Sequence, residues 1–126
     1  MTQFTLLFAS ILGGLAVIFG AFGAHALKKL LNEDQLKSFE TGVKYQLYHA
    51  IVLLVIGFNL SLDTTLEKYM VYSFMIGIIL FSFSISGLVI SSANNKKLKF
   101  LGPITPLGGL LLVSGWILLC FSILNL

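Results

Sequence analysis

The sequence has no arginine, only one cysteine and few charged residues of any kind. Its eight basic residues are all lysine, whereas proteins that read bases and phosphates rely on the planar guanidinium group of arginine. The net charge of +3 is therefore not evidence for nucleic-acid binding. Cys120 on its own can form neither an internal disulfide nor a thiolate metal cluster, and we expect it to pack as a small apolar side chain.

The shortage of charge points to a membrane. Charged residues make up 10% of the 126 residues and the mean hydropathy is +0.98; soluble domains have about 25% charged residues. All 13 charges fall within residues 28–44, 63–68 and 96–99, and each charge-free run between or outside these windows is about as long as a membrane span needs. Backbone groups in lipid must be paired within their own segment, which favours helices. We predict spans at residues 4–24, 45–60, 69–91 and 106–123.

The predicted fold is thus an all-α membrane protein, a single four-transmembrane-helix bundle over residues 1–126. Seven of the eight lysines lie in the loops after the first and third spans, and Lys68 alone lies on the other side. This bias predicts that the lysine-rich loops are cytoplasmic and that both termini lie outside the cell membrane.

The first loop is predicted to extend the second helix as an amphipathic cytoplasmic segment. Asn32 can cap a helix that begins near Glu33, and Gln35 stands where a capping box requires it. Apolar residues then recur at helical spacing into the second span.

Small residues recur at spacings of three, four or seven in three spans. The positions are Ala9, Gly13, Ala16, Gly20 and Ala24; Ser73, Gly77, Ser84, Gly87 and Ser91; and Gly108 and Gly115. Helices in lipid associate through close backbone approach at such positions. These stripes favour a tight bundle within one chain, and a homo-oligomer or a larger membrane complex stays open.

A polar cluster near the start of the second span is the main candidate site. Polar side chains inside a membrane are costly, and they usually face partners or a pathway. We expect Thr41, Tyr45, Tyr48 and His49 on one face of the second helix, with Gln46 on its flank and His49 about one turn inside the membrane. His25 leaves the first span at a similar depth, so the two imidazoles are expected as neighbours at the cytoplasmic end. The cluster consists of His25, Thr41, Tyr45, Gln46, Tyr48 and His49. It either pins the first two helices together or forms a proton-linked or ligand-binding site; the pinning role is favoured because no intramembrane acid completes a relay.

Residues 102–109 form a second candidate region. Thr105 is predicted to cap the fourth helix, with Pro106 as its first residue. Beside Lys96, Lys97 and Lys99, this helix start either makes a rigid turn or holds a lipid headgroup.

Three stretches also resemble a known family. They are residues 20–27, residues 39–50 with Tyr45-Gln46-Leu47-Tyr48-His49, and residues 102–109 followed by Gly115-Trp116. Together they resemble the YwdK/YgdD-like family of small bacterial membrane proteins, a domain of unknown function. The resemblance implies a four-span fold in the cell membrane and supplies no activity.

Motifs for catalysis, metal binding and nucleotide binding are missing from the spans. We therefore expect no enzyme, no cofactor and no metal site. The first hypothesis is a non-enzymatic accessory or membrane-organising factor whose partners are membrane lipids. The alternative is a minimal transporter or proton-linked channel with a polar cytoplasmic mouth. A lipid-modifying enzyme is a weaker hypothesis, because it needs a nucleophile that the sequence does not offer.

Overall fold

The structure is a computed structural model that describes residues 1–96 and 98–125, and of residue 24 it describes only the backbone. Four helical spans are long and apolar enough to cross a membrane, at 26, 27, 29 and 26 residues. In chain order they consist of α1 (Thr2–Ile18), η1 (Phe19–Gly23) and α2 (Ala24–Leu27); α3 (Glu33–Asn59); α4 (Thr65–Ile78), η2 (Ile79–Phe83) and α5 (Ser84–Ala93); and η3 (Lys99–Leu101) with α6 (Ile104–Leu124). The predicted all-α, four-span fold is confirmed.

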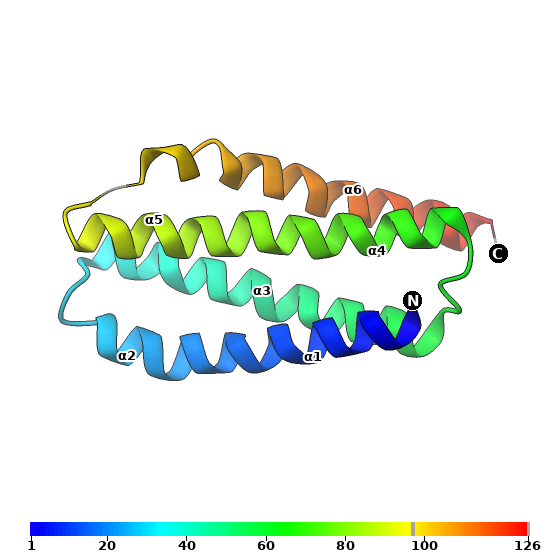
Figure 1. The fold of residues 1–126 in the computed structure, drawn as a ribbon, viewed down its shortest axis with the longest axis horizontal. Coiled ribbons are helices and arrows are strands. Elements are labelled where there is room, and N and C mark those ends of the chain that lie inside the picture. The colour runs from blue at the N-terminus through cyan, green and yellow to red at the C-terminus, as the bar shows by residue number, and fades with distance from the viewer. Residues whose placement is uncertain (97, 126) are drawn as a thin grey trace.

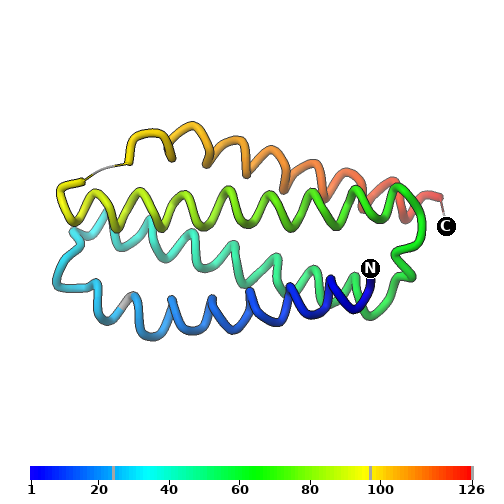
Figure 2. The backbone as a smooth tube through the Cα atoms, viewed as in Figure 1, coloured from blue at the N-terminus to red at the C-terminus, as the bar shows by residue number. Residues whose placement is uncertain are grey.

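The spans form an antiparallel bundle (Figure 1). The first span packs along α3, α3 also packs against α5 and η2, and α6 packs against α4 and η2. The N-terminus and the described C-terminal residues lie at the same end as the turn between α3 and α4 (Figure 2). We call this the terminal end. The opposite end carries the loops that follow α2 and α5, and we call it the lysine-rich end because Lys28, Lys29, Lys96 and Lys99 lie there.

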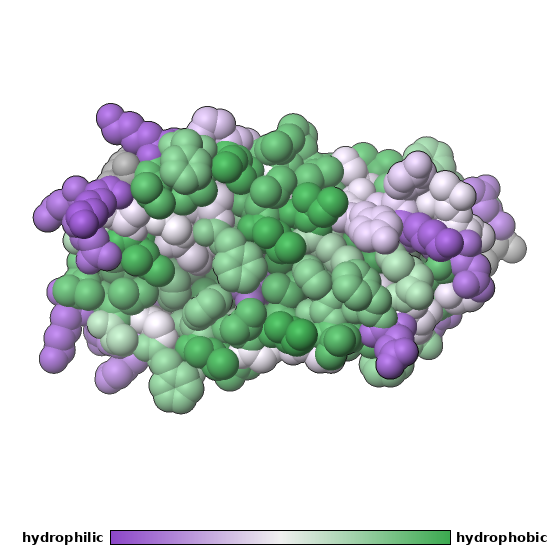
Figure 3. Space-filling model, in the orientation of Figure 1, coloured by the Kyte–Doolittle hydropathy of each residue, from purple (hydrophilic) through white to green (hydrophobic). Residues whose placement is uncertain are grey.

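The surface matches a protein that spans a membrane. In Figure 3 the hydrophilic side chains gather towards the two ends, and a wide apolar belt covers the helices between them. Large apolar side chains in this belt are exposed, among them Phe58 at 74% and Leu110 at 66%. Side chains of this kind are stable against lipid rather than water.

The start of α3 was predicted correctly. Asn32 accepts a hydrogen bond from the backbone N–H of Gln35 at 2.8 Å, and the Gln35 side chain accepts one from the Asn32 N–H at 3.1 Å. This reciprocal capping box satisfies two amides that a helix start leaves free. The second helix therefore extends well beyond the charge-free run that predicted it.

The predicted start of the fourth helix was wrong by two residues. α6 begins at Ile104, and Pro103 occupies the cap position with φ −67°. The Thr105 hydroxyl lies 2.6 Å from the Ser84 hydroxyl and 3.4 Å from the Leu101 carbonyl oxygen, to which it donates. Since Thr105 bonds to neighbouring segments rather than to free amides, it joins α6 to α5 instead of capping α6.

Three glycines predicted to permit close helix approach do so inside this chain. A Cβ atom added at Gly77 would lie 2.9 Å from the Leu112 backbone nitrogen, and one at Gly115 would lie 2.8 Å from the Phe74 ring. One at Gly108 would collide with the backbone of η2. The span formed by α4 and η2 and the helix α6 therefore meet almost backbone to backbone, as small residues permit in lipid.

Among the side chains that the structure describes, buried apolar residues fall into two clusters of unequal size. The main core has 12 members, most of them from mid-length to the terminal end: Ala9, Leu12, Ala50, Leu53, Ile56, Leu62, Met70, Val71, Phe74, Met75, Ile78 and Leu112. The lysine-end cluster has three buried members, Leu31, Phe39 and Val89. The bundle therefore buries more apolar residues in its terminal half than at its lysine-rich end.

Two π-helical turns, η1 and η2, interrupt the first and third spans. Their aromatic residues Phe19 and Phe83 meet edge to face, with ring centroids 6.3 Å apart. A π turn inserts an extra residue and locally widens the helix, and such turns often mark functional places.

Candidate functional site

Gln46 is a polar residue in the interior of the bundle. It lies midway along α3 and is 2% exposed. Its side-chain N–H donates to the backbone carbonyl oxygen of Leu12 on α1 at 2.9 Å. This bond gives the buried amide nitrogen a partner and ties α3 to α1.

His49 lies one helical turn further along α3, towards the terminal end, and is 5% exposed. The indole N–H of Trp116 donates to its Nε2 at 3.2 Å, and its Nδ1 lies 2.8 Å from the Tyr45 carbonyl oxygen. An indole nitrogen can only donate, so Nε2 acts as the acceptor. The proton of the neutral ring then lies on Nδ1, which donates to Tyr45. Both nitrogens are engaged, one to its own helix and one to α6.

Aromatic rings enclose this imidazole. Phe74 of α4 and Trp116 of α6 lie 5.8 and 6.1 Å from it, centroid to centroid, and Tyr45 stacks on it at 6.3 Å. Phe74 and Trp116 also meet edge to face at 5.6 Å. His49 is therefore the point at which α3, α4 and α6 come together.

The predicted polar cluster is only partly one site. Tyr45 is 41% exposed and Tyr48 53%, and both belong to the outer surface. The Thr41 hydroxyl donates to the Lys37 carbonyl oxygen of its own helix at 3.0 Å. Only Gln46 and His49 are buried, and they serve different neighbours. The orientation of α3 about its own axis directs the side chains of Thr41, Tyr45 and Tyr48 away from the buried interior.

The expected proximity of His25 and His49 is wrong. Added Cβ atoms at Gly20 and Gly23 would lie 3.4 Å from Val43 and 3.2 Å from Phe39, which fixes the antiparallel register. His25 then lies level with residue 38, eleven residues from His49, or about 16 Å at 1.5 Å per residue. His25 is exposed at the lysine-rich end.

The depth of the cluster in a membrane stays a prediction, and the structure gives only its place along the helix. α3 begins twelve residues before Tyr45, so Gln46 and His49 lie near mid-length of the bundle and not at its lysine-rich mouth.

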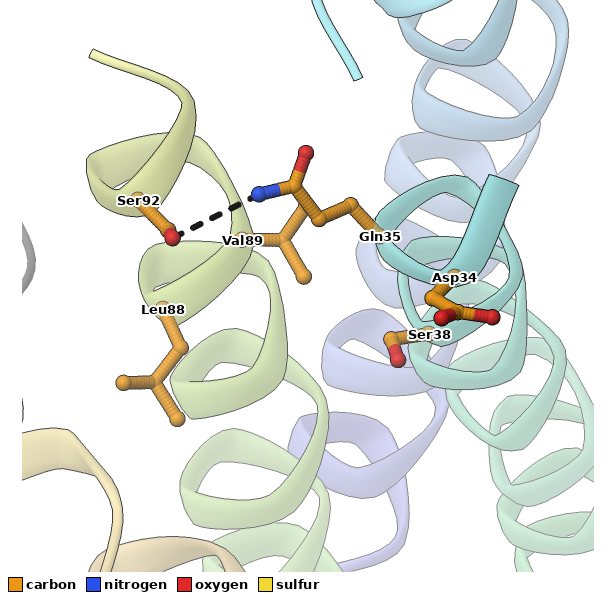
Figure 4. A pocket seen from close by; sticks show the side chains of 6 residues that line it. All are labelled: Asp34, Gln35, Ser38, Leu88, Val89 and Ser92. Atoms are coloured by element: carbon orange, nitrogen blue, oxygen red, sulfur yellow. Dashed lines mark hydrogen bonds between the residues drawn. The ribbon is translucent and has the colours of Figure 1, made fainter. Parts of the chain in front are cut away.

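The predicted headgroup contacts separate in a similar way. Lys96 and Lys99 are exposed in the segment that joins α5 to α6, whereas Thr105 is committed to Ser84. Lys97 lies outside the described residues. Nearby, Figure 4 shows the Gln35 side chain reaching from α3 to α5, where it donates to the Ser92 hydroxyl at 3.4 Å. This bond crosses a shallow pocket of about 230 Å³ lined by Asp34, Gln35, Ser38, Leu88, Val89 and Ser92.

The sequence reasoning missed two side chains that organise the bundle. Trp116 was noted only within a family motif, although an indole N–H at mid-span needs an acceptor. Glu67, 7% exposed, accepts from the backbone N–H groups of Asp63 and Thr64 at 3.0 and 3.2 Å. The Thr64-x-x-Glu67 pattern is a capping-box signal that was overlooked.

A lipid-facing groove lies over His49. Residues of α3, η2 and α6 enclose about 250 Å³ there, and the lining includes Tyr45, Phe81, Val113 and Trp116. Among the side chains that the structure describes, no three His, Cys, Asp or Glu residues converge as metal ligands would. Both nitrogens of the imidazole beneath this groove are already hydrogen-bonded.

Fold and surface define an integral membrane protein with four helical spans. The chain belongs to a family described as a protein of unknown function, DUF423, whose model matches residues 19–109. A UPF0382 membrane protein of Staphylococcus aureus is 39% identical over 111 residues, covering 86% of this chain and 84% of the relative. One from Haemophilus influenzae is 34% identical over 110 residues, covering 87% and 85%. No solved structure matches this chain. The family resemblance drawn from the motifs is confirmed.

Proposed function

We propose that this protein is a non-enzymatic, membrane-organising accessory factor of the cell membrane that gathers anionic lipids around its lysine-rich end. The observation that carries the proposal is that the polar groups fall into two kinds: some are buried and bonded within the bundle, and others are exposed at one end. Gln46 and His49, two of the buried polar groups, form hydrogen bonds to α1 and α6. Exposed lysines at one end are left to act on the surroundings.

Charge supports the role of that end. Residues 28–44 and 96–99 together carry seven lysines and three acidic residues, whereas residues 63–68 carry one lysine and two acidic residues. A lysine near an anionic membrane surface contributes about 1 kcal/mol of attraction. The same bias supports an orientation with both termini outside.

Brominated lipids test the gathering of anionic lipid. Trp116 is the only tryptophan and is 45% exposed, so it is a native fluorescent probe. In vesicles of equal parts phosphatidylglycerol and phosphatidylcholine, brominated phosphatidylglycerol should quench Trp116 more strongly than brominated phosphatidylcholine. Replacing Lys28, Lys29, Lys96 and Lys99 with Gln should remove the difference. Equal quenching of the unaltered protein would contradict the proposal.

A flux assay tests the competing role of a proton-linked channel. Vesicles that contain the protein and a pH-sensitive dye should leak protons no faster than protein-free vesicles. A proton flux that disappears in a folded His49→Ala variant would replace the accessory role with transport.

Orientation has its own test. In a Cys120→Ser background, an impermeant thiol reagent added to intact cells should label Ser61→Cys and spare Lys99→Cys. The reverse pattern would invert the proposed topology.

A further inference from the structure

The largest of the described cavities lies apart from the His49 cluster, at the lysine-rich end. It has a volume of about 470 Å³ and lies between α2 and η1 on one side, and α5 and η2 on the other. Its lining is apolar except for one hydroxyl group: Phe19, Gly23, Ala26, Leu27, Phe39, Phe83, Ser86, Gly87 and Ile90. We call it the α2–α5 crevice.

Aromatic side chains line the base and the inner end of the crevice. Phe39 of α3, 2% exposed, forms the base, and the edge-to-face pair of Phe19 and Phe83 lies at the inner end. From Leu27 to Phe19 the wall runs eight residues, or about 12 Å. A slot of this length and lining suits part of one hydrocarbon chain, because nothing but apolar surface and one serine faces it.

The outer end of the crevice meets the lysines. Lys28 and Lys29 directly follow the lining residue Leu27, and Lys96 follows the end of α5, whose residue Ile90 lines the opposite wall. These lysine side chains are exposed. A molecule with a hydrocarbon chain in the crevice would place its polar end among these charges, which favours a negatively charged headgroup.

A second groove of the bundle makes an informative contrast. It is lined by α3 and α6 towards the terminal end, has a volume of about 310 Å³, and includes Val55, Asn59 and Trp116. It is almost entirely apolar as well, but the nearest charged window, residues 63–68, carries a net negative charge. Apolar lining is therefore common to both grooves, and of these two the α2–α5 crevice is the one that lies beside lysines.

We propose that the α2–α5 crevice binds one acyl chain of an anionic phospholipid whose headgroup is held by Lys28 and Lys29. This proposal rests on the proposed function and deepens it. It assigns one lipid to a defined binding site, whereas the proposed function requires only a general enrichment of lipid around the bundle. Lipid tails gain nothing from the hydrophobic effect when they leave the bilayer for a protein groove. Selectivity therefore comes from close packing in the slot and from the lysine–headgroup attraction.

Native mass spectrometry of the full chain in a mild detergent tests the proposed lipid-binding site. The protein is equilibrated with equal amounts of phosphatidylglycerol and phosphatidylcholine of identical acyl chains. One phosphatidylglycerol should be retained per protein, in about fivefold preference to phosphatidylcholine for each lysine that holds the headgroup.

Ser86→Phe fills the crevice, and Val55→Phe is its matched control in the second groove. Retention of the single phosphatidylglycerol should be lost in Ser86→Phe and kept in Val55→Phe. A thermal melt of each variant checks folding, and Ala26→Phe, on the opposite wall, replaces Ser86→Phe if that variant does not fold. Lys28→Gln with Lys29→Gln should remove the preference for phosphatidylglycerol without opening or filling the slot.

The outcomes separate this proposal from the general one. If folded crevice variants keep the bound phosphatidylglycerol while Trp116 quenching still shows enrichment, the binding site is wrong and the proposed function stands. If the crevice variants lose a lipid that was bound without regard to headgroup, the anionic-lipid site is overturned, and unselective Trp116 quenching would overturn the proposed function as well.

Discussion

The terminal half and the lysine-rich end of this bundle are built differently. The main core has 12 buried apolar residues and the lysine-end cluster has three. Towards the terminal end, Gly77 and Gly115 allow α4 and α6 to approach almost backbone to backbone, whereas at the other end the first and third spans part around a cavity of about 470 Å³. The comparison shows that buried apolar packing is concentrated in one region, and that the proposed lipid site lies in the other.

Truncating one phenylalanine in each region should give the largest contrast. Phe74→Ala removes a ring that is 0% exposed in the main core, and we expect it to cost about 4 kcal/mol of unfolding free energy. Phe39→Ala should cost about half as much, because the space it leaves joins the crevice and lipid can fill it. Unfolding in mixed micelles measures both values. Equal losses would remove the distinction between the two regions.

A pair of adjacent glycines tests how closely α6 packs against η2. A Cβ at Gly108 would lie 2.8 Å from the Leu80 carbonyl carbon, a backbone atom that cannot move aside cheaply. Gly108→Ala should therefore cost about 3 kcal/mol. At Gly109 the nearest atom is a Phe81 ring carbon at 3.7 Å. Gly109→Ala should be neutral or stabilise the helix by up to about 1 kcal/mol. Thermal melts of the two variants measure these changes in stability. Similar effects at both positions would mean that α6 packs less closely against η2 than the structure shows.

The His49–Trp116 hydrogen bond should make a smaller contribution. Hydrogen bonds between membrane helices contribute about 1 kcal/mol or less. A double-mutant cycle with His49→Leu and Trp116→Phe should show a coupling of about that size, since each single change leaves the partner without its hydrogen bond. Tyr48→Phe, on the outer surface, serves as the control. Zero coupling would show that the ring contacts alone join α3 to α6.

The polar tie at the lysine-rich end should matter least. Gln35 donates to Ser92 at 3.4 Å in a partly exposed setting, so Ser92→Ala should change stability by less than about 0.5 kcal/mol. The Asn32 capping box does not involve Ser92 and should persist. A larger loss in the same melt would show that the lysine-rich end is held more firmly than its sparse core suggests.

Local sequence patterns predicted the start of α3 correctly, and the Thr105 cap of α6 was the exception. They did not give the relative orientation of the helices. Asn32 and Gln35 predict the start of α3, because a capping box depends only on two residues three positions apart. Glu67 could have been found by the same rule. The six-residue polar cluster is not one site for two reasons. On α3, Tyr45 and Tyr48 turn outwards while Gln46 and His49 turn in. His25 lies on α2, and the packing of α2 against α3 places it far from His49.

By itself, the sequence determined the four spans, their helical nature and the concentration of lysine at one end. These properties depend on uninterrupted apolar length, on the need to pair backbone groups in lipid and on residues a few positions apart. Only the tertiary structure decided that His49 meets Trp116, 67 positions away, and that His25 does not meet His49. It also decided that a crevice opens beside Lys28 and Lys29. Helix register and rotation settle such pairings, and they result from how all four spans pack together.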